Sequence, residues 1–416
     1  MAITLSDVSN ALQKVIMPFI QDNLPKQTIL MDQLKRNQGT TFMNDNFYAP
    51  IRTSRHGGVV NLANDGSTLL SGKSGIGQAS IGVKIVTGTF DISKLAIDAT
   101  KTTKGAVENQ LTFQARSLAT DFARSINRQY YSDGYGIVAE AVGSVGAGTF
   151  TVKAPTASVD DGRSTAVFYG SINGDIQPTK YLAPGQIIGI GTAGASIGTI
   201  STITPTDGGG TIVLTGVQEA NANDAIYIVD GAAAGAGTSE IQGIRAALGQ
   251  TSGTYAGVAR STTGWAPQLD TTAETLTLSS IEKVYLSAKE YSQMGDRYAI
   301  FMNKTLYKKY GDLLTALRRQ VNETELLGGW TGLEFAAGAG KVGVFLDYDV
   351  PDGEVLVINL DTFTVCQVSD MDWMEDPSGA LIRRVDKITY QATMVWFTNL
   401  LCLCPAANGR LAQKKG

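Results

Sequence analysis

The feature that most constrains this chain is a strand-like run over residues 82–97 that leads into a long amphipathic helix, predicted from about 103 to 131. Thr103 can serve as its N-cap, and Asp133-Gly134 supplies a stop. So much ordered backbone with so little reactive chemistry predicts a structural element that packs on another surface. The apolar stripe that would be buried recurs every three or four residues and consists of Val107, Leu111, Ala115, Leu118, Ala119, Phe122, Ala123, Ile126 and Tyr130.

Size and composition favour several domains in an assembly. A chain of 416 residues and 44.0 kDa exceeds one ordinary core, so we expect two or three domains or one domain with large excursions. Charged residues make up 17%, below the roughly 25% of typical soluble domains, which suggests that neighbouring subunits cover much of the surface. A net charge of −4 leaves no global basic field, so nonspecific nucleic-acid binding is not the expected main function, although local contact stays open.

Neither a membrane anchor nor a redox or metal centre is expected. No run approaches the ~18 apolar residues of a membrane span, and the first residues lack a signal-peptide pattern. Cys366, Cys402 and Cys404 cannot form a disulfide framework and fit a reducing cytoplasm. Cys402 and Cys404 are predicted on a buried strand, since no second Cys/His pair exists to complete a zinc site. We expect no metal and no cofactor.

The first third of the chain divides into three predicted parts. Residues 1–46 form an arm that is helical over 5–36 but broken by Pro18 and Pro25. Residues 47–82 read as two strands with a Gly/Ser-rich tip. Because a lone hairpin is marginally stable in water, we expect it to lie on a partner subunit. Residues 83–142 hold the strand and the long helix.

The sequence pattern of the rest of the chain changes twice, at about residue 143 and at about residue 231. Residues 143–230 alternate β-branched runs with turn clusters, which predicts a small antiparallel barrel or sandwich inserted between two α+β pieces. Over 231–416 the sequence again predicts a mixture of helices and strands. The fold class is therefore α+β with an all-β insertion. In the last part we predict helices at about 279–294 and 304–319, and strands at 298–302, 342–346, 354–359, 363–368, 380–386 and 388–403.

Several motifs resemble catalytic or nucleotide-binding sites but fail on context. GxGxxG at Gly189, Gly191 and Gly194 is followed by β-branched residues rather than by a helix that could face a pyrophosphate. GxSxG at 194–198 would need a later histidine, but the single histidine, His56, lies upstream. A loop similar to Walker A at 66–74 has a spacer one residue too long, and GAGK at 338–341 lacks the following Ser or Thr.

An acidic run is the remaining candidate for chemistry. Its hard oxygen ligands could hold a divalent cation, but the spacing of an EF-hand is missing, so a solvated acidic loop is the preferred interpretation. The sequence thus predicts no catalytic site and no enzyme. The acidic run comprises Asp370, Asp372, Glu375 and Asp376.

In the order of its parts the chain resembles the major capsid proteins of tailed double-stranded DNA phages, which have the Hong Kong 97-type fold. GVKIVTGTFDISKLAIDAT leading into ENQLTFQARSLATDFARSINRQYY is similar to the family's strand entering its spine helix. EIQGIRAALG and RYAIFMNKTLYKKYGDLL are similar to its capsomer-forming domain. The resemblance implies an N-arm, an extended β-hairpin loop, a spine helix and a mixed α/β axial domain, with the 143–230 insertion on the shell exterior.

The resemblance also implies a function. The chain would self-assemble, as hexamers and pentamers, into the icosahedral head shell around phage double-stranded DNA. Implied partners are a portal, a scaffolding protein, a possible decoration protein and DNA in weak local contact. The location would be the virion, after assembly in the host bacterial cytoplasm. Candidate interface residues are Arg52, Arg55, Lys73, Arg116, Arg124 and Arg128.

An alternative from another class stays open at this point. The β domain at 143–230 could bind carbohydrate or a receptor on a surface or tail protein, with Tyr169, Tyr181 and Tyr227 as the binding platform. Aromatic side chains in strands are more often core than platform, which favours the shell interpretation.

Overall fold

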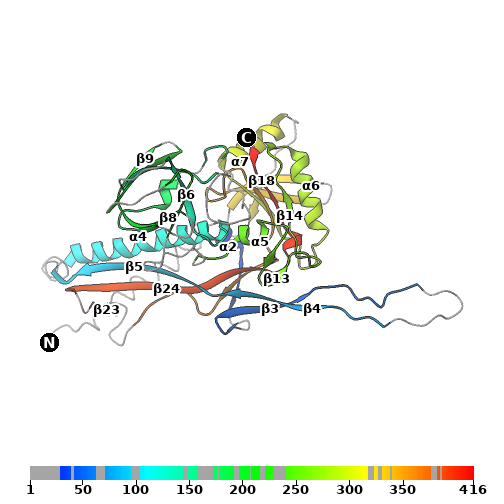
Figure 1. Ribbon diagram of the computed structural model, residues 1–416, viewed down its shortest axis with the longest axis horizontal. Helices are drawn as coiled ribbons and strands as arrows, with labels where there is room; N and C mark the ends of the chain where they lie inside the picture. The colour runs from blue at the N-terminus through cyan, green and yellow to red at the C-terminus, as the bar shows by residue number, and fades with distance from the viewer. Residues whose placement is uncertain are drawn as a thin grey trace.

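Four parts make up the molecule in the computed structural model (Figure 1). A long helix lies along two long strands, a β-barrel and a mixed domain lie above it, and a hairpin projects beyond the body. No helix of the described residues is long and apolar enough to cross a membrane. The structure describes residues 29–38, 42–61, 71–95, 104–143, 148–156, 172–175, 178–191, 196–206, 208–215, 221–228, 240–316, 323–326, 330–337, 340–375, 382–384 and 387–416.

The long helix, α4 (Lys104–Tyr131), packs on a pair of antiparallel strands, β5 (Lys84–Ser93) and β24 (Thr389–Cys402). The members of the predicted apolar stripe from Ala115 to Tyr130 are buried or partly buried, and Leu118 and Phe122 face β5 at Gly88. Gly88 permits the close approach, because a Cβ there would lie 3.0 Å from Leu118 Cδ1. The predicted helix is confirmed, whereas its expected cap, Thr103, lies outside the described residues.

β24 is the centre of a larger sheet. It pairs with β21 (Phe363–Gln367), β22 (Asp372–Trp373) and β23 (Ile382–Arg383), and β1 (Lys35–Gln38) adds to β21 in parallel. The helical prediction for 5–36 is therefore wrong at its end, where α2 (Ile29–Gln33) stops and β1 begins. The edge of β21 supplies hydrogen-bond partners that local propensity cannot reveal. Residues 5–28 lie outside the described residues.

The mixed domain is a sheet covered on both faces. β16 (Tyr298–Met302) is parallel to one neighbour and antiparallel to the other, and all its residues are buried. Ile300 and Met302 pack with α6 and α7, whereas Ala299 and Phe301 pack in the cluster shared with α4 and α5. The sheet order is β14 (Gln268–Asp270), β25 (Gly409–Leu411), β20 (Val355–Asn359), β16, β19 (Gly340–Leu346), β18 (Trp330–Ala337) and β17 (Glu323–Leu326); the helices are α5 (Ile244–Leu248), α6 (Leu278–Lys289) and α7 (Lys304–Ala316).

The predicted elements of this domain are largely present. β16 has the predicted bounds, and α7 begins at the predicted residue, Lys304. Helix α6 ends at Lys289, five residues before the predicted end, and its N-terminus is fixed by a capping box between Thr277 and Ser280. Strands β14, β17, β18 and β25 were not predicted.

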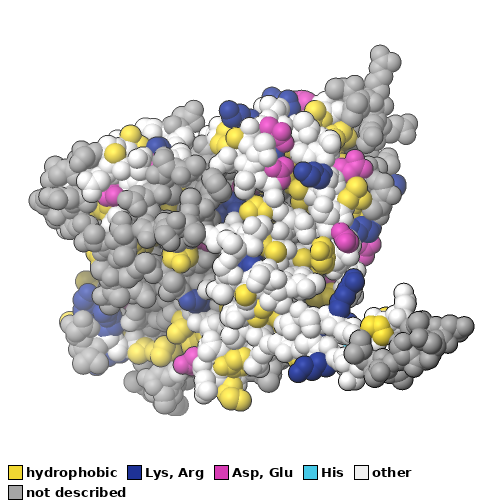
Figure 2. Space-filling view, turned by 45° about the vertical axis from the view of Figure 1, so that its right-hand side comes forward, with side chains coloured by type: hydrophobic (Ala, Val, Ile, Leu, Met, Phe, Trp, Pro, Cys, Tyr) yellow, Lys and Arg dark blue, Asp and Glu magenta, His cyan; other side chains and the backbone are white. Residues whose placement is uncertain are grey.

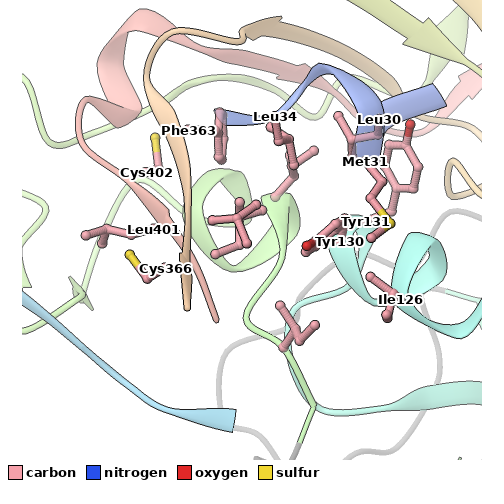
Figure 3. Close-up of a cluster of buried hydrophobic side chains, with 14 of the residues drawn as sticks. Leu30, Met31, Leu34, Ile126, Tyr130, Tyr131, Phe363, Cys366, Leu401 and Cys402 are labelled. Atoms are coloured by element: carbon pink, nitrogen blue, oxygen red, sulfur yellow. The ribbon is translucent and has the colours of Figure 1, made fainter. Parts of the chain in front are cut away.

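The largest hydrophobic cluster joins segments that are far apart in the sequence (Figure 3). Leu30 and Met31 from α2 lie beside Ile126, Tyr130 and Tyr131 from the end of α4. Phe363, Cys366, Leu401 and Cys402 from β21 and β24 complete the view. Burying these side chains stabilises the contact between the long helix and the sheet by about 25 cal/mol per Å² of apolar surface removed from water.

The all-β segment is a closed barrel with its own core. Its strands are ordered β10-β7-β6-β11-β8-β9, and its interior is filled by branched apolar side chains such as Ile188, Ile212 and Ile226. The first strand precedes the predicted start at 143. The strands are β6 (Ile137–Val142), β7 (Thr149–Lys153), β8 (Ile187–Ile190), β9 (Ser196–Thr206), β10 (Gly209–Thr215) and β11 (Ala225–Ile228).

The projecting hairpin consists of β3 (Asn46–Arg52) and β4 (Ile76–Gly82), with β2 (Phe42–Met43) beside β3. Its base packs on the body through Phe47, Ala79 and Ile81, which are buried. The remaining short elements are η1 (Pro178–Tyr181), β12 (Thr254–Tyr255), β13 (Val258–Ala259), β15 (Glu274–Thr275), η3 (Pro405–Ala407) and β26 (Lys414–Lys415).

Candidate assembly surfaces and the loop that joins the domains

The glycine motifs of the barrel lie in β-structure. Gly189 belongs to β8, and β9 begins at Ser196, so a strand stands where a dinucleotide site needs a helix N-terminus. Gly191 makes the turn with φ +77°, and a Cβ there would meet the Asp224 carboxylate. Gly194 lies outside the described residues. Ser196 and Gly198 are strand residues rather than parts of a strand-to-helix elbow.

The other motifs are equally structural where they are described. Lys73 and Ser74 lie in the hairpin just before β4, and Lys341 lies in β19. His56 is exposed and accepts a hydrogen bond at Nδ1 from the Gly58 amide, 3.1 Å away, as a turn residue does. Residues 66–70 and 338–339 lie outside the described residues.

Burial makes the cysteine thiols unreactive. Burial raises the pKa of the Cys366 thiol to about 11 and that of Cys402 to about 12, so both stay protonated at neutral pH and are weak nucleophiles. Within the described ranges, no three His, Cys, Asp or Glu side chains are grouped to hold a metal ion. Asp370, Asp372 and Glu375 are exposed, and Asp376 lies outside those ranges.

A short acidic loop connects the domains. We name residues 347–354, between β19 and β20, the junction loop. Asp347 accepts a hydrogen bond from the Tyr131 hydroxyl of α4 at 2.9 Å. Asp349 accepts from Asn127 Nδ2 of α4 at 2.7 Å, from Tyr181 Oη at 2.8 Å and from Lys180 Nζ at 3.0 Å, the last two in η1 beside the barrel. These two carboxylates therefore tie the long helix and the barrel to the mixed domain.

The second half of the junction loop binds residues 172–175, which lie between β7 and β8 in the sequence. Asp352, 1% exposed, accepts from the Asn173 amide at 2.8 Å, from Asn173 Nδ2 at 3.0 Å and from the Gly174 amide at 2.8 Å. Asp175 continues this contact by accepting from Thr305 Oγ1 of α7 at 2.6 Å. Among the described residues the barrel core forms a hydrophobic cluster of its own, and these polar contacts attach the barrel to the mixed domain.

The last residue of the junction loop, Glu354, forms a buried ionic triad. It is fully buried and accepts from Arg410 Nε at 3.0 Å, and it is ion-paired with Arg245 of α5. Burial alone would raise the pKa of Glu354, but Arg245 and Arg410 outweigh burial and lower it. Burial raises the pKa of Asp347, with a further contribution from Asp349, and also raises that of Asp352. Local patterns did not predict this loop as a contact site, although three Asp and one Glu within DYDVPDGE were a visible signal.

Replacing Asp352 by alanine is expected to lower the free energy of unfolding by about 1–3 kcal/mol, because the buried amides of Asn173 and Gly174 lose their acceptor. Urea unfolding of the two proteins measures the difference. Asp296→Ala is the control, since that side chain is 62% exposed in its pair with Lys289 and its loss should cost within about 0.5 kcal/mol. Equal unfolding midpoints for Asp352→Ala and the control would contradict the expectation.

The hairpin offers a basic and apolar surface. Arg52, Arg55 and Lys73 are exposed, and residues 46–61 and 71–82 contain no Asp or Glu. Val59 is 88% exposed and Ile76 82% exposed. Apolar side chains this exposed on a projecting element are typical of a surface that a partner covers.

The arginines predicted on the long helix divide into two groups. Arg116 and Arg124 are exposed, and Arg124 makes a surface pair with Asp121 at 3.8 Å. Arg128 is instead buried, ion-paired with Glu240 and placed over the Tyr181 ring. As an interface residue Arg128 was predicted wrongly, because the helix turns that position toward the mixed domain and the barrel.

A second exposed apolar surface lies on the face of β5 and β24 that points away from α4. Ile85 and Phe397 are cross-strand partners and are 58% and 37% exposed. At the far end of the strands Leu95 and Ile388 are 78% and 75% exposed. Elsewhere acidic and basic side chains are interspersed, as the upper part of the face in Figure 2 shows, and neither sign dominates it.

Comparison with known proteins rests on structure alone. No family model matches the sequence, and no curated protein matches it. A chain of the cyanophage A-1(L) capsid asymmetric unit aligns over 95% of this chain and 96% of its own length, with a TM-score of 0.52 and 12% identity. The holo-SrpI encapsulin complex of Synechococcus elongatus PCC 7942 aligns over 93% and 87%, with a TM-score of 0.45 and 7% identity. The capsid of Myoviridae phage XM1 aligns over 92% and 90%, with a TM-score of 0.41 and 10% identity.

Proposed function

We propose that this chain, which has the α+β Hong Kong 97-type fold, is a major capsid protein that self-assembles into the icosahedral head shell of a tailed phage. The observation that carries the proposal is the end-to-end structural likeness to the cyanophage capsid chain. A likeness over nearly the whole of both chains covers the arrangement of the domains as well as their separate folds. Its role is structural rather than catalytic, and its place is the virion.

Two surfaces support a role in repeated self-contact. The projecting hairpin and the open face of β5 and β24 both expose large apolar side chains, including Ile76 and Ile85. A protein that worked alone would carry the cost of exposing them to water, whereas a symmetric assembly buries each surface once per copy. Many modest contacts repeated with symmetry stabilise a closed shell.

The partners proposed for the shell follow from its place in a phage head. Copies of the chain form hexamers and pentamers, and a portal, a scaffolding protein and a decoration protein meet them during assembly in the host cytoplasm. Packaged double-stranded DNA makes weak local contact, in keeping with a net charge of −4. Arg52, Arg55 and Lys73 pair with acidic patches of neighbouring copies, and Arg116 and Arg124 lie on a second such surface.

The carbohydrate-binding alternative gains no support from the described residues. Tyr227 is 3% exposed in the barrel wall, and Tyr181 donates its hydroxyl to Asp349. Tyr169 lies outside the described residues. Aromatic rings held in this way present no flat surface to a sugar.

Sedimentation of the purified full-length chain, followed by negative-stain imaging of the fast fraction, tests the proposal. We expect closed shells or hexameric and pentameric rings, either from the chain alone or after co-expression with the proteins encoded beside it. A stable monomer or trimer under every condition would contradict the proposal. Glycan-array binding by such a monomer would then favour the alternative.

A further inference from the structure

The two outer edges of the projecting hairpin differ in their backbone chemistry. In an antiparallel pair, residues alternate between positions whose amide and carbonyl point to the partner strand and positions where they point away. Thr53 donates to the Gly75 carbonyl at 3.0 Å and Val83 donates to the Asp45 carbonyl at 2.9 Å, so these positions point inward. Between these two positions, every second cross-strand pair therefore has its amides and carbonyls pointing outward, away from the partner strand.

Two hydrogen bonds at the base of the hairpin confirm this alternation. The Ser80 amide donates to the Ala256 carbonyl at 2.8 Å, and the Gly82 carbonyl accepts from Asn399 Nδ2. Both groups point away from β3. The outer edge of β4 is thus already used for pairing near the body. Further along the same edge, Gln78 and Ile76 also point outward, and no described residue donates to or accepts from their outward groups.

The outer edge of β3 is blocked at the corresponding position. Pro50 is the cross-strand partner of Gln78, so it too points outward, and it has no amide hydrogen to offer. Proline on an edge strand prevents the addition of a further strand. Near the body this edge of β3 pairs with β2 at Asn46 and Phe47, and beyond β2 it is interrupted at Pro50, whereas the facing position on the edge of β4 is open.

We propose that the outer edge of β4 at residues 76–78 accepts an extended strand from a second copy of this chain. The proposal rests on the shell function, and it adds which edge is used and how it is used. The hairpin projects beyond the body of its own chain at this point (Figure 1), so the described body does not supply the strand. The incoming strand forms main-chain hydrogen bonds with Gln78 and Ile76, as in β-strand addition.

Charge and exposure indicate that the added strand comes from another copy. Residues 46–61 and 71–82 carry Arg52, Arg55 and Lys73 and contain no Asp or Glu, whereas the whole chain has a net charge of −4, so the rest of a second copy is acidic overall. The side chain of Ile76, 82% exposed, lies beside the open edge and would be covered by the incoming strand. Electrostatic attraction then orients the contact, and the main-chain bonds give it strength.

Moving the proline across the hairpin tests the proposal. Gln78→Pro removes the outward amide from β4, and Pro50→Gln restores one on β3; the double variant exchanges the two residues without changing composition or charge. Gln78→Ala controls for loss of the side chain. We expect the yield of sedimenting shells to fall about ten-fold or more for Gln78→Pro and for the double variant, because lost main-chain hydrogen bonds recur in every copy. Pro50→Gln and Gln78→Ala should assemble like the unmodified chain.

Folding of each variant is checked on the unassembled fraction by circular dichroism and protease resistance. The native Pro50 shows that the hairpin tolerates proline at an outward position, so Gln78→Pro should keep its fold. In shells of the unmodified chain, hydrogen exchange at the Gln78 amide should be slowed relative to the unassembled chain. Normal shell yield from folded Gln78→Pro, or an unprotected Gln78 amide in shells, overturns this inference alone. Failure of the unmodified chain to assemble under any condition overturns the proposed function as well.

Discussion

Replacing Glu354 by alanine is expected to lower the free energy of unfolding by about 3–5 kcal/mol. The carboxylate is fully buried between Arg410, also fully buried, and Arg245, which is 5% exposed. Its removal takes a hydrogen-bonded carboxylate away from two guanidinium groups that lie in an interior of low dielectric constant. Urea unfolding of the two proteins at neutral pH measures the loss, and an unfolding midpoint near that of the unmodified chain would contradict it.

Two control variants separate burial from charge. Asp121→Ala removes a carboxylate from a pair with Arg124 in which both side chains are about 70% exposed, and its cost should stay within about 0.5 kcal/mol. The triple variant Arg245→Met, Glu354→Leu, Arg410→Met replaces the triad with apolar side chains and should recover much of the stability, because the desolvation of three charges is avoided. A triple variant as unstable as Glu354→Ala would mean that packing rather than charge accounts for the loss.

The same triad sets part of the pH dependence. The pKa of Glu354 is lowered in the folded chain, so its contribution is present above the ordinary carboxyl pKa and is lost as pH falls through the folded value. Glu354→Gln should therefore show a shallower loss of stability in strong acid. Asp347 and Asp352 act in the opposite sense, since a raised pKa makes their contribution smaller as pH rises from the ordinary value through the raised one.

Deleting the projecting part of the hairpin is expected to abolish shell formation while leaving the chain folded. Residues 54–74 are removed and Thr53 is joined to Gly75 by Asn-Gly, which suits a tight hairpin turn. The two ends already lie together, because the Thr53 amide donates to the Gly75 carbonyl at 3.0 Å. The buried base, with Phe47 and Ala79, is kept. The shortened chain should sediment as a monomer with a thermal unfolding temperature close to that of the full chain.

A charge-reversal variant separates the effect of the hairpin's length from the effect of its charge. Arg52→Glu with Arg55→Glu keeps its full length and should lower the shell yield less than the deletion does, and this loss should diminish at high salt, where the reversed charges are screened. Charge contacts between exposed groups are screened by salt, so an unchanged yield and shell stability would exclude a role for these two arginines. Shells formed by the deletion variant would contradict the role of the hairpin altogether.

Local patterns predicted the regular elements of this protein well. The helix over 104–131 has a strong period and contains neither glycine nor proline in its body after Gly105, so its own chemistry sufficed. β16 and the start of α7 were equally clear, because a short apolar run followed by Asn303 and an amphipathic segment is a common strand-to-helix pattern. The alternation of β-branched runs with turns predicted a barrel or sandwich, and the structure is a barrel.

Other elements depend on partners distant in the sequence. β1 is a strand because the edge of β21, more than three hundred residues later, accepts it, as in the pairing of Lys35 with Thr364. β14 and β25 are too short to show a period and exist only as neighbours in the mixed sheet. The position of Arg128, buried against Glu240, depends on how α4 meets the mixed domain, which no local pattern contains.

The sequence by itself determined the long helix, the hairpin strands, the β-rich segment and the absence of a recognisable catalytic motif, because spacing, turn residues and composition act over a few neighbouring positions. Only the tertiary structure decided which carboxylates became structural and which surfaces stayed exposed. Nothing local to Asp352 and Glu354 shows that the fold brings Asn173 to the first and Arg245 and Arg410 to the second. Burial and pairing arise from long-range contacts, and these fix the junction loop and leave one edge of the hairpin open.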